Sequence, residues 1–190
     1  VATYLHAILA AAGYRTGLLT SPHAYRITDR WRVNGRVMND KTFASLVEQI
    51  QPALEQYART SPYDTVSFFE LTDILGFLHF AQQRVQWAVL EVGLGGAYCS
   101  SNVITHKDAA IVTNIGWDHV ELLGPRKIDI AREKAGIINT PCHVFTMEKQ
   151  ARLRDLFAQR TKKYGGAFHY IEAKNFRVRQ TDIRGTDFTY

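Results

Sequence analysis

The sequence has 190 residues, of which 46% are hydrophobic and 22% are charged, with 13 Gly and 5 Pro. That length fits one ordinary domain with its own core, and the composition excludes a disordered, collagen-like or low-complexity chain. The net charge of +5 comes from scattered residues, which favours small anionic substrates and argues against a nucleic-acid-binding surface.

The first forty residues predict a helix, a strand and a polar loop. Apolar residues recur at three- and four-residue spacing over Val1–Ala12, and Gly13 follows as a helix stop. The stretch Thr16–Ser21 (TGLLTS) is typical of a short strand. The polar stretch after it contains Asn34-Gly35, a turn signal that indicates a small hairpin.

Two helices and a strand are expected next. Lys41–Tyr57 follows Asp40 as a helix cap and carries one apolar stripe. Ser67–Gln82 is apolar on more sides, which is typical of a buried helix. The continuous apolar run Trp87–Val92 predicts a buried strand with one carboxylate inside it.

The second half of the chain alternates strands with helices. Ala109–Ile115 predicts a buried strand and His143–Met147 a weaker one, and helices are expected over Pro125–Ile138 and Glu148–Tyr164. From Gly165 onward, short alternating stretches (AFHYIE, NFRVRQ and TDFTY) indicate an antiparallel edge or a small β appendage. We therefore assign residues 1–190 to one α/β domain with three layers, a mostly parallel sheet and no internal boundary.

Three predicted strands end in chemically unusual sequences, which contain Ser21, Glu91 and His119. Ligands of open parallel sheets bind beyond the carboxyl ends of the strands. Glu91 lies within an apolar run, and a buried carboxylate needs a cation, a metal or a proton. A hydroxyl, a carboxylate and an imidazole on one edge of one sheet can bind Mg²⁺. Ordinary roles stay open for each residue: an ion pair for Glu91, a helix cap for Ser21 and a loop position for His119.

The glycine-rich turn Gly93-x-Gly95-Gly96 would allow close approach of the backbone to a ligand, although many plain turns have the same composition. It is not a dinucleotide fingerprint, because GxGxxG is absent, and no GxxxxGK[ST] phosphate loop occurs in the sequence.

Cys99 and Cys142 are too few for a disulfide scaffold and match no CxxC spacing, so we expect two reduced thiols in a cytoplasmic protein. No apolar run approaches the roughly 20 residues that span a bilayer, and no secretory signal is visible. We therefore expect no membrane association.

Five stretches occur in the order, and at about the spacing, found in one enzyme family. They are TSPHAYRITDRWRVNG, SFFELTDILGFLHFA, VLEVGLGG, TNIGWDHVELLG and IAREKAGII. The sequence thus resembles folylpolyglutamate synthase and the bifunctional dihydrofolate synthase, which belong to the Mur ligase superfamily. The resemblance covers nearly the whole chain and implies the central domain of these enzymes, which is similar to P-loop nucleotide-binding folds.

The resemblance also implies segments that the sequence does not contain. In the family, a GTNGKGS phosphate loop stands directly before the helix that Val1 opens, and a Rossmann-like domain follows the region that ends at Tyr190. We therefore expect a truncated central (ATPase) domain, about the first half of such an enzyme. The isolated chain is expected to be inactive.

The resemblance implies an ATP-dependent, amide-forming ligase. ATP would phosphorylate a carboxylate of folate or dihydropteroate, and the amine of L-glutamate would attack the resulting acyl phosphate. The full-length enzyme is expected to be a monomer. Two alternatives stay open: a non-catalytic fragment or binding module, and another Mur-type ligase that joins an amino acid to a different carboxylate.

The resemblance assigns metal ligands by position. Ser21, Glu91 and His119 match the family's Mg²⁺ ligands, so His119 is expected to have a catalytic role as well. Lys134 matches a catalytic lysine that is carbamylated to hold a second metal.

Four further residues match positions at the substrate. Arg26 and Arg30 match a loop near the folate and phosphate groups, and Asn114 and Asp118 match the motif around the metal histidine, which they would orient. The sequence departs from the family pattern EVGLGGRLDATN, because Ala97 replaces the arginine and Cys99 the aspartate. These departures imply either an altered substrate preference or a copy that has lost catalysis.

Overall fold

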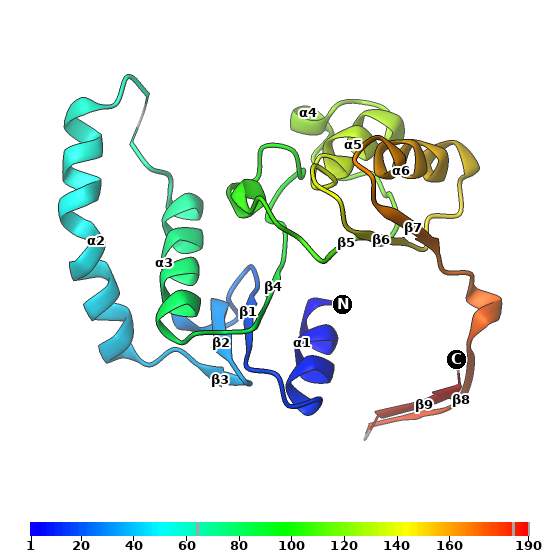
Figure 1. Ribbon diagram of the computed structural model, residues 1–190, viewed down its shortest axis with the longest axis horizontal. Coiled ribbons are helices and arrows are strands. Elements are labelled where there is room, and N and C mark those ends of the chain that lie inside the picture. Colours follow the sequence, from blue (N-terminus) through cyan, green and yellow to red (C-terminus); the bar gives the residue numbers. More distant parts are fainter. Residues whose placement is uncertain (64, 184, 190) are drawn as a thin grey trace. The chain divides into compact units, whose positions relative to one another are not determined.

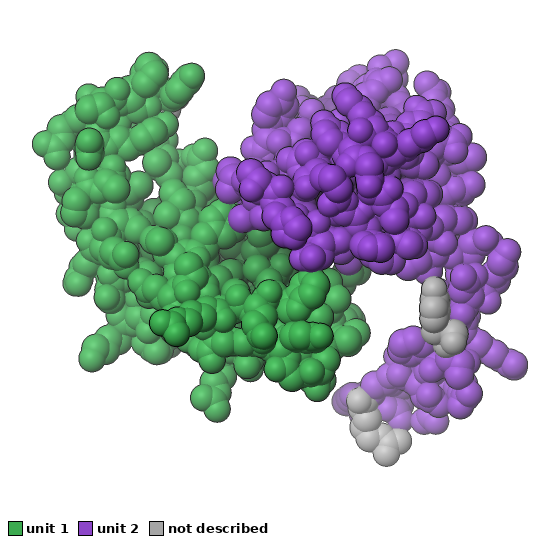
Figure 2. All heavy atoms as spheres, viewed as in Figure 1, with its two compact units in different colours: residues 1–94 green, residues 95–190 purple. Residues whose placement is uncertain are grey.

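The computed structural model describes residues 1–63, 65–183 and 185–189. Its internal contacts divide the chain into two compact units, Val1–Leu94 and Gly95–Tyr190 (Figure 2). Each unit has a sheet and a hydrophobic core of its own. The assignment of residues 1–190 to one family domain stays a prediction.

A four-stranded mixed sheet forms the centre of the first unit (Figure 1). Its strands are β1 (Thr16–Leu19), β2 (Trp31–Val33), β3 (Arg36–Val37) and β4 (Trp87–Leu90), in the order β3-β2-β1-β4. β1 runs parallel to β4 and antiparallel to β2. The small hairpin predicted from Asn34-Gly35 is confirmed as β2–β3, with a positive φ at both turn residues.

Three helices belong to this unit: α1 (Ala2–Ala11), α2 (Asp40–Thr60) and α3 (Phe68–Gln82). All three predicted helices are confirmed, but the cap of α2 was placed one residue too late. Asn39 is the cap, because its side-chain oxygen accepts the N–H of Thr42 at 2.9 Å. Ser67 and Glu70 form a reciprocal capping box at the start of α3.

The core of the first unit forms between α2, α3 and the sheet. Trp31 is fully buried, and its indole N–H donates to the carbonyl of Thr72 in α3 at 2.9 Å. The close approach of α3 requires a glycine at Gly76, because a Cβ there would lie 2.7 Å from Leu19. Leu46, Ile50 and Leu75 complete the buried cluster.

The second unit contains a three-stranded parallel sheet, β5 (Ala109–Val112), β6 (His143–Thr146) and β7 (Ala167–Tyr170), in that order. Val112 and Val144 are buried on one face, whereas Ile111 on the other face is 38% exposed. Helices α5 (Lys127–Ala135) and α6 (Ala151–Lys163) pack together (Figure 1), and their buried residues Ile130 and Phe157 share a core with the buried face.

A short helix and a 3-10 turn stand in the connections of the second unit. The 3-10 turn η2 (Ser100–Val103) precedes β5, and α4 (Val120–Leu123) follows it. Two further 3-10 turns occur elsewhere, η1 (Ile27–Arg30) before β2 and η3 (Ala173–Asn175) after β7. Among the described residues, no helix is long and apolar enough to cross a membrane.

The small antiparallel appendage predicted at the C-terminus is confirmed as the hairpin of β8 (Arg177–Asp182) and β9 (Gly185–Thr189). Tyr190, the last residue of the predicted TDFTY stretch, lies outside the described residues. One stretch assigned to this appendage is placed differently. AFHYIE forms β7, which pairs in parallel with β6, because α6 returns the chain to the same end of the sheet.

The α/β class, with parallel strands and a small antiparallel sheet at the C-terminus, is confirmed. β1 and β4 pair in one sheet and β5, β6 and β7 in another. In the described residues, β4 is the last strand of the first sheet and β5 is an outer strand of the second.

Candidate functional site

The ends of β1 and β4 bring Ser21 and Glu91 together. The two strands are parallel, with Leu19 opposite Leu90, so the residues that follow them leave the sheet at the same edge. The main-chain N–H of Ser21 donates to Oε2 of Glu91 at 3.0 Å, and the N–H of Glu91 donates to the carbonyl of Leu19 at 3.0 Å. Two of the three predicted Mg²⁺ ligands therefore lie side by side, as the strand-end argument expects.

The Glu91 carboxylate is half-buried and has no cationic partner in the described part of the chain. Among the residues that the structure describes, no Lys, Arg or His forms an ion pair with it. Of the ordinary roles left open for Glu91, an ion pair is not present among the described residues, whereas partial exposure at the end of the strand is. A half-buried carboxylate held by one backbone amide keeps an oxygen with which it can bind an external cation.

Arg30 lies close to the same edge, because its main-chain carbonyl accepts the N–H of Thr20 at 3.0 Å. The residue is only 7% exposed. Its Nε donates to Nδ1 of His23 at 3.1 Å, and its guanidinium lies 5.5 Å from the ring centroid of Phe68. Neither neighbour is an anion, so the charge of Arg30 can be offered to an anionic ligand.

Arg26 has a different environment from Arg30. Its side chain is 55% exposed and forms an ion pair with Asp40. The backbone around it is fixed by Asp29, whose Oδ2 accepts the N–H groups of Arg26 at 2.9 Å and Tyr25 at 3.1 Å. These bonds, that of Arg26 first, lower the pKa of the Asp29 carboxyl below its usual 3.8.

In the second unit, the loop after β5 carries Asn114, Asp118 and His119. His119 has a positive φ of 46° and caps the short helix α4. Its Nε2 lies 3.6 Å from the Asp118 carboxylate and its Nδ1 lies 3.7 Å from that of Glu121. Both are ion-pair distances rather than hydrogen bonds. Within the described chain, the exposed Asn114 side chain makes no hydrogen bond to His119.

Glu148 is a site residue that the sequence analysis missed. It was assigned to a helix, but it precedes α6 and its side chain is buried. Oε2 accepts the N–H of Ile115 at 2.6 Å, and Oε1 accepts that of Gln150 at 2.8 Å. The available signal was a carboxylate directly after the apolar run 143–147, the same pattern that drew attention to Glu91.

The glycine-rich turn serves close packing in the second unit. The N–H of Ala97 donates to the carbonyl of Glu133 at 3.0 Å, and a Cβ at Gly96 would lie 2.7 Å from the same oxygen. The turn therefore lies against the end of α5, the helix that carries Lys134. The Lys134 side chain is half-buried, and its amine has no hydrogen-bond or ion-pair partner among the described residues.

The two departures from the family pattern have structural contacts inside the unit. The backbone and Cβ of Ala97 lie where a Cβ on Gly136 would stand, at 2.3 Å. The thiol of Cys99 lies 3.1 Å from the hydroxyl of Ser101. Neither contact involves a charged group.

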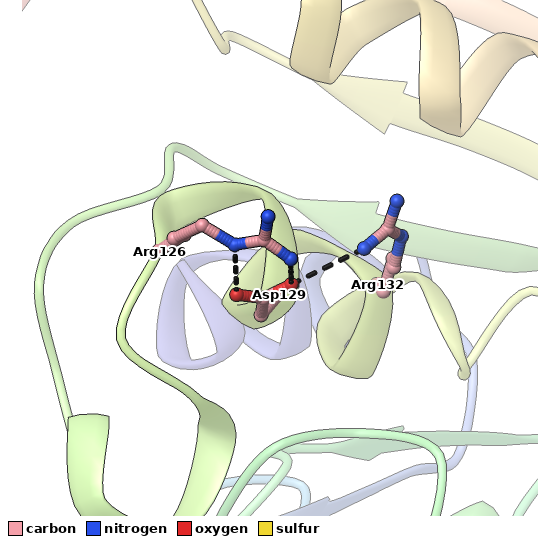
Figure 3. Close-up of polar contacts among 3 residues, drawn as sticks. All are labelled: Arg126, Asp129 and Arg132. Atoms are coloured by element: carbon pink, nitrogen blue, oxygen red, sulfur yellow. Dashed lines mark hydrogen bonds and ion pairs between the residues drawn. The ribbon is translucent and has the colours of Figure 1, made fainter.

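The start of α5 is held by a charged cluster of three residues (Figure 3). Arg126 donates two hydrogen bonds to Asp129, both at 2.7 Å, and Arg132 donates a third at 3.2 Å. The bond from Arg126 is the main cause that lowers the pKa of the Asp129 carboxyl below 3.8. The cluster organises the helix that carries Lys134, one turn further along.

The predicted metal site is divided between the two units. Ser21 and Glu91 belong to the first and His119 and Lys134 to the second. In the described part of the chain, no three His, Cys, Asp or Glu side chains form a group that could hold a metal ion. The shared Mg²⁺ site of Ser21, Glu91 and His119 and the second site at Lys134 stay predictions.

Comparisons with known proteins give consistent matches, although no protein-family model matches the chain. The chain is 32% identical over 169 residues to the dihydrofolate synthase/folylpolyglutamate synthase of Bacillus subtilis, covering 88% of this chain and 39% of that protein. It is similar to the crystal structure of folylpolyglutamate synthase from Thermotoga maritima, with a TM-score of 0.87, 27% identity, and coverage of 98% of this chain and 42% of that one.

A third match is a solved complex of a folylpolyglutamate synthase with AMPPCP and folate. Its TM-score is 0.84 at 28% identity, and the match covers 97% of this chain and 48% of that one. The chain thus spans less than half the length of each of these three relatives.

Proposed function

Since the chain belongs to the folylpolyglutamate synthase/dihydrofolate synthase family of the Mur ligase superfamily, we propose that the complete protein adds L-glutamate to a carboxylate of folate or dihydropteroate, using ATP. ATP as co-substrate is supported by a relative solved with AMPPCP and folate. The observation in this chain that carries the proposal is the Ser21–Glu91 pair beside the buried Arg30, at one edge of a parallel sheet.

The edge of the first unit offers the charges that such a reaction needs. Phosphoryl transfer from ATP brings anionic phosphates to an anionic carboxylate, and catalysis depends on positioning and on compensating that charge. Arg30 supplies a buried cation without a carboxylate partner in its unit. We propose that it binds an anionic group of the folate or of the phosphoryl donor.

The donor set fits a hard divalent cation. Glu91 has a carboxylate without a cationic partner among the described residues, and the main-chain N–H of Ser21 donates to it, which brings a residue with a hydroxyl to the same edge. We propose that Ser21, Glu91 and His119 would hold Mg²⁺, and that a carbamylated Lys134 would hold a second metal. Bound Mg²⁺ would supply charge neutralisation at the transferred phosphate.

The proposed reaction has two steps. The carboxylate oxygen of folate or dihydropteroate attacks the γ-phosphorus of ATP, and the bond from that phosphorus to the bridging oxygen breaks, which releases ADP. The amine of glutamate then attacks the carbonyl carbon of the acyl phosphate, loses a proton, and expels phosphate. The side chains of this chain bind and orient the reactants, and none of them needs to act as a nucleophile.

The proposal is tested with the protein encoded by the full reading frame that contains this chain. Phosphate release should require folate or dihydropteroate, glutamate, ATP and Mg²⁺ together, and mass spectrometry should detect the glutamylated product. Glu91→Gln should lower kcat/KM by about a hundredfold or more, and Glu48→Gln, on the exposed face of α2, serves as the control. A full-length protein that releases no phosphate with either acceptor would refute the proposal.

A further inference from the structure

Glu148 is 3% exposed, yet its ordinary charged form has no cationic side chain as a partner within the described residues. Arg154, a cation that contacts this segment, donates to the main-chain carbonyls of Lys149 at 2.8 Å and Glu148 at 3.4 Å rather than to the carboxylate. Such a residue is expensive to bury unless its oxygens are hydrogen-bonded.

Both oxygens of Glu148 meet this need with backbone amides from two different segments. Oε2 accepts the N–H of Ile115 in the loop that leaves β5, and Oε1 accepts the N–H of Gln150 at the start of α6. At 2.6 Å, the bond to Ile115 has the short length of a charge-assisted hydrogen bond. The carboxylate thereby joins the loop after β5 to the body of the unit.

A second set of bonds holds the same loop two positions earlier, at Thr113. The carbonyl of Thr113 accepts the N–H of Met147 at 3.0 Å and the hydroxyl of Thr146 at 3.2 Å. The side chain of Ile115 is itself buried in the core. The chain is therefore fixed up to Ile115 by the end of β6 and by Glu148.

Beyond Ile115 the loop has two further contacts: the Lys127 amine lies 5.8 Å from the centroid of the Trp117 ring, and the carbonyl of His119 accepts the N–H groups of Leu122 at 2.9 Å and Leu123 at 2.8 Å. The residues from Gly116 to His119 are exposed, and a Cβ on Gly116 would meet no atom within 4 Å. Asp118 and His119 therefore stand between the Ile115 anchor on one side and α4 on the other. His119 follows the Ile115 anchor by four residues, so a fixed anchor keeps His119 within about 14 Å of it.

We infer that Glu148 is a positioning residue, which holds the loop 113–119 through its charged, two-amide contact and so sets where Asp118 and His119 stand. Any effect of Glu148 on catalysis rests on the proposed function, whereas its structural role in holding the loop 113–119 does not. Glutamine is a poor replacement, because its amide group would place N–H donors against one of the two backbone N–H donors. Aspartate keeps the charge but is one methylene shorter.

Amide hydrogen exchange of the purified chain tests the inference without any ligase assay. Glu148→Gln should raise exchange at Ile115 by about ten- to hundredfold, while the amides of β6 and β7 keep their protection. Glu148→Asp should give a smaller increase, since it restores the charge. Thr161→Val removes a buried hydroxyl that donates to Phe157 within α6 at 2.7 Å, and should leave Ile115 unchanged.

Two results would overturn the inference: unchanged exchange at Ile115 in Glu148→Gln, or a general loss of protection across the second unit, which would make Glu148 an ordinary stability residue. If Glu148→Gln does not fold, Glu148→Asp carries the test, because it shortens the carboxylate that contacts the Ile115 amide, and unchanged exchange at Ile115 in that variant would also overturn the inference. In the full-length protein, Glu148→Gln should also raise the Mg²⁺ concentration for half-maximal activity, whereas Thr161→Val should not. Absence of ligase activity in the wild-type protein would refute the proposed function. The role of Glu148 would still be decided by the hydrogen-exchange measurement.

Discussion

Nε2 of His6 accepts a hydrogen bond from the main-chain N–H of Gly35 at 3.0 Å, which ties α1 to the turn between β2 and β3. His6 is 4% exposed, and burial is the main cause that lowers its pKa below 6.5, with the charge of Arg32 contributing in the same direction. Because Nε2 can accept only in the neutral ring, the folded chain favours the unprotonated histidine.

The first prediction follows from the sign of that shift. The unfolded chain binds a proton on His6 before the folded chain does, so the free energy of unfolding should fall as pH drops below about 6.5 and level off below the folded pKa. His6→Gln, which keeps an acceptor for Gly35, should give a shallower pH dependence in urea unfolding. The exposed His106→Gln is the control. Some pH dependence of the free energy of unfolding should remain in His6→Gln, because burial also lowers the pKa of His79. The same pH dependence in His6→Gln as in the wild type would contradict the prediction.

The second prediction separates the structural and functional parts of Ser21. The bond to Glu91 uses the main-chain N–H of Ser21 and not its hydroxyl. Ser21→Ala should therefore change the free energy of unfolding by less than about 0.5 kcal/mol. In the full-length protein, the same variant should require more Mg²⁺ for half-maximal activity. A variant with unchanged Mg²⁺ dependence would remove Ser21 from the proposed ligand set.

The third prediction concerns Arg30. Lysine keeps the charge but cannot reproduce both the bond to His23 and the planar contact with Phe68. Arg30→Lys should lower the free energy of unfolding by about 1 kcal/mol and raise the KM for folate by about tenfold, which corresponds to about 1.4 kcal/mol. Arg26→Lys, at an exposed ion pair, should change the free energy of unfolding by less than about 1 kcal/mol. If steady-state kinetics give Arg30→Lys the same KM for folate as the wild type, Arg30 does not bind the folate.

The fourth prediction compares two glycines. Gly96→Ala would bring a methyl group within 2.7 Å of the carbonyl of Glu133, which is backbone and cannot move away easily. We expect a loss of about 1–3 kcal/mol in the free energy of unfolding. Gly116→Ala has open space and an ordinary φ, so it should stay within about 0.5 kcal/mol of wild type. Equal melting temperatures for the two variants would mean that the turn does not pack against α5 as described.

Local patterns in the sequence were sufficient for most of the fold. The apolar periodicity predicted the helices α1, α2 and α3, and Asn34-Gly35 predicted the hairpin, because each signal lies within a few neighbouring residues. The five collinear stretches identified the family, which the comparisons confirm. Boundaries were less accurate: the cap of α2 is Asn39 and not Asp40, since both residues are good caps and only the hydrogen bond to Thr42 distinguishes them.

The candidate site could be anticipated only in part. The strand-end argument placed Ser21 next to Glu91, because parallel strands present their carboxyl ends at one edge. It could not show that the contact uses the backbone of Ser21, nor that AFHYIE would pair in parallel as β7. Both depend on how distant segments are paired, which no local pattern records.

The sequence by itself determined the elements, the α/β class and the family, because these follow from residue types at short spacing and from motif order. Only the tertiary structure decided the environment of each charged group. Glu91 has no cationic partner among the residues that the structure describes, Arg30 is buried beside a histidine and a phenylalanine, and Glu148 binds two backbone amides, one of them 33 residues away at Ile115. The physical reason is that the cost of burying a charge is set by the groups around it, and folding brings those groups from distant parts of the chain.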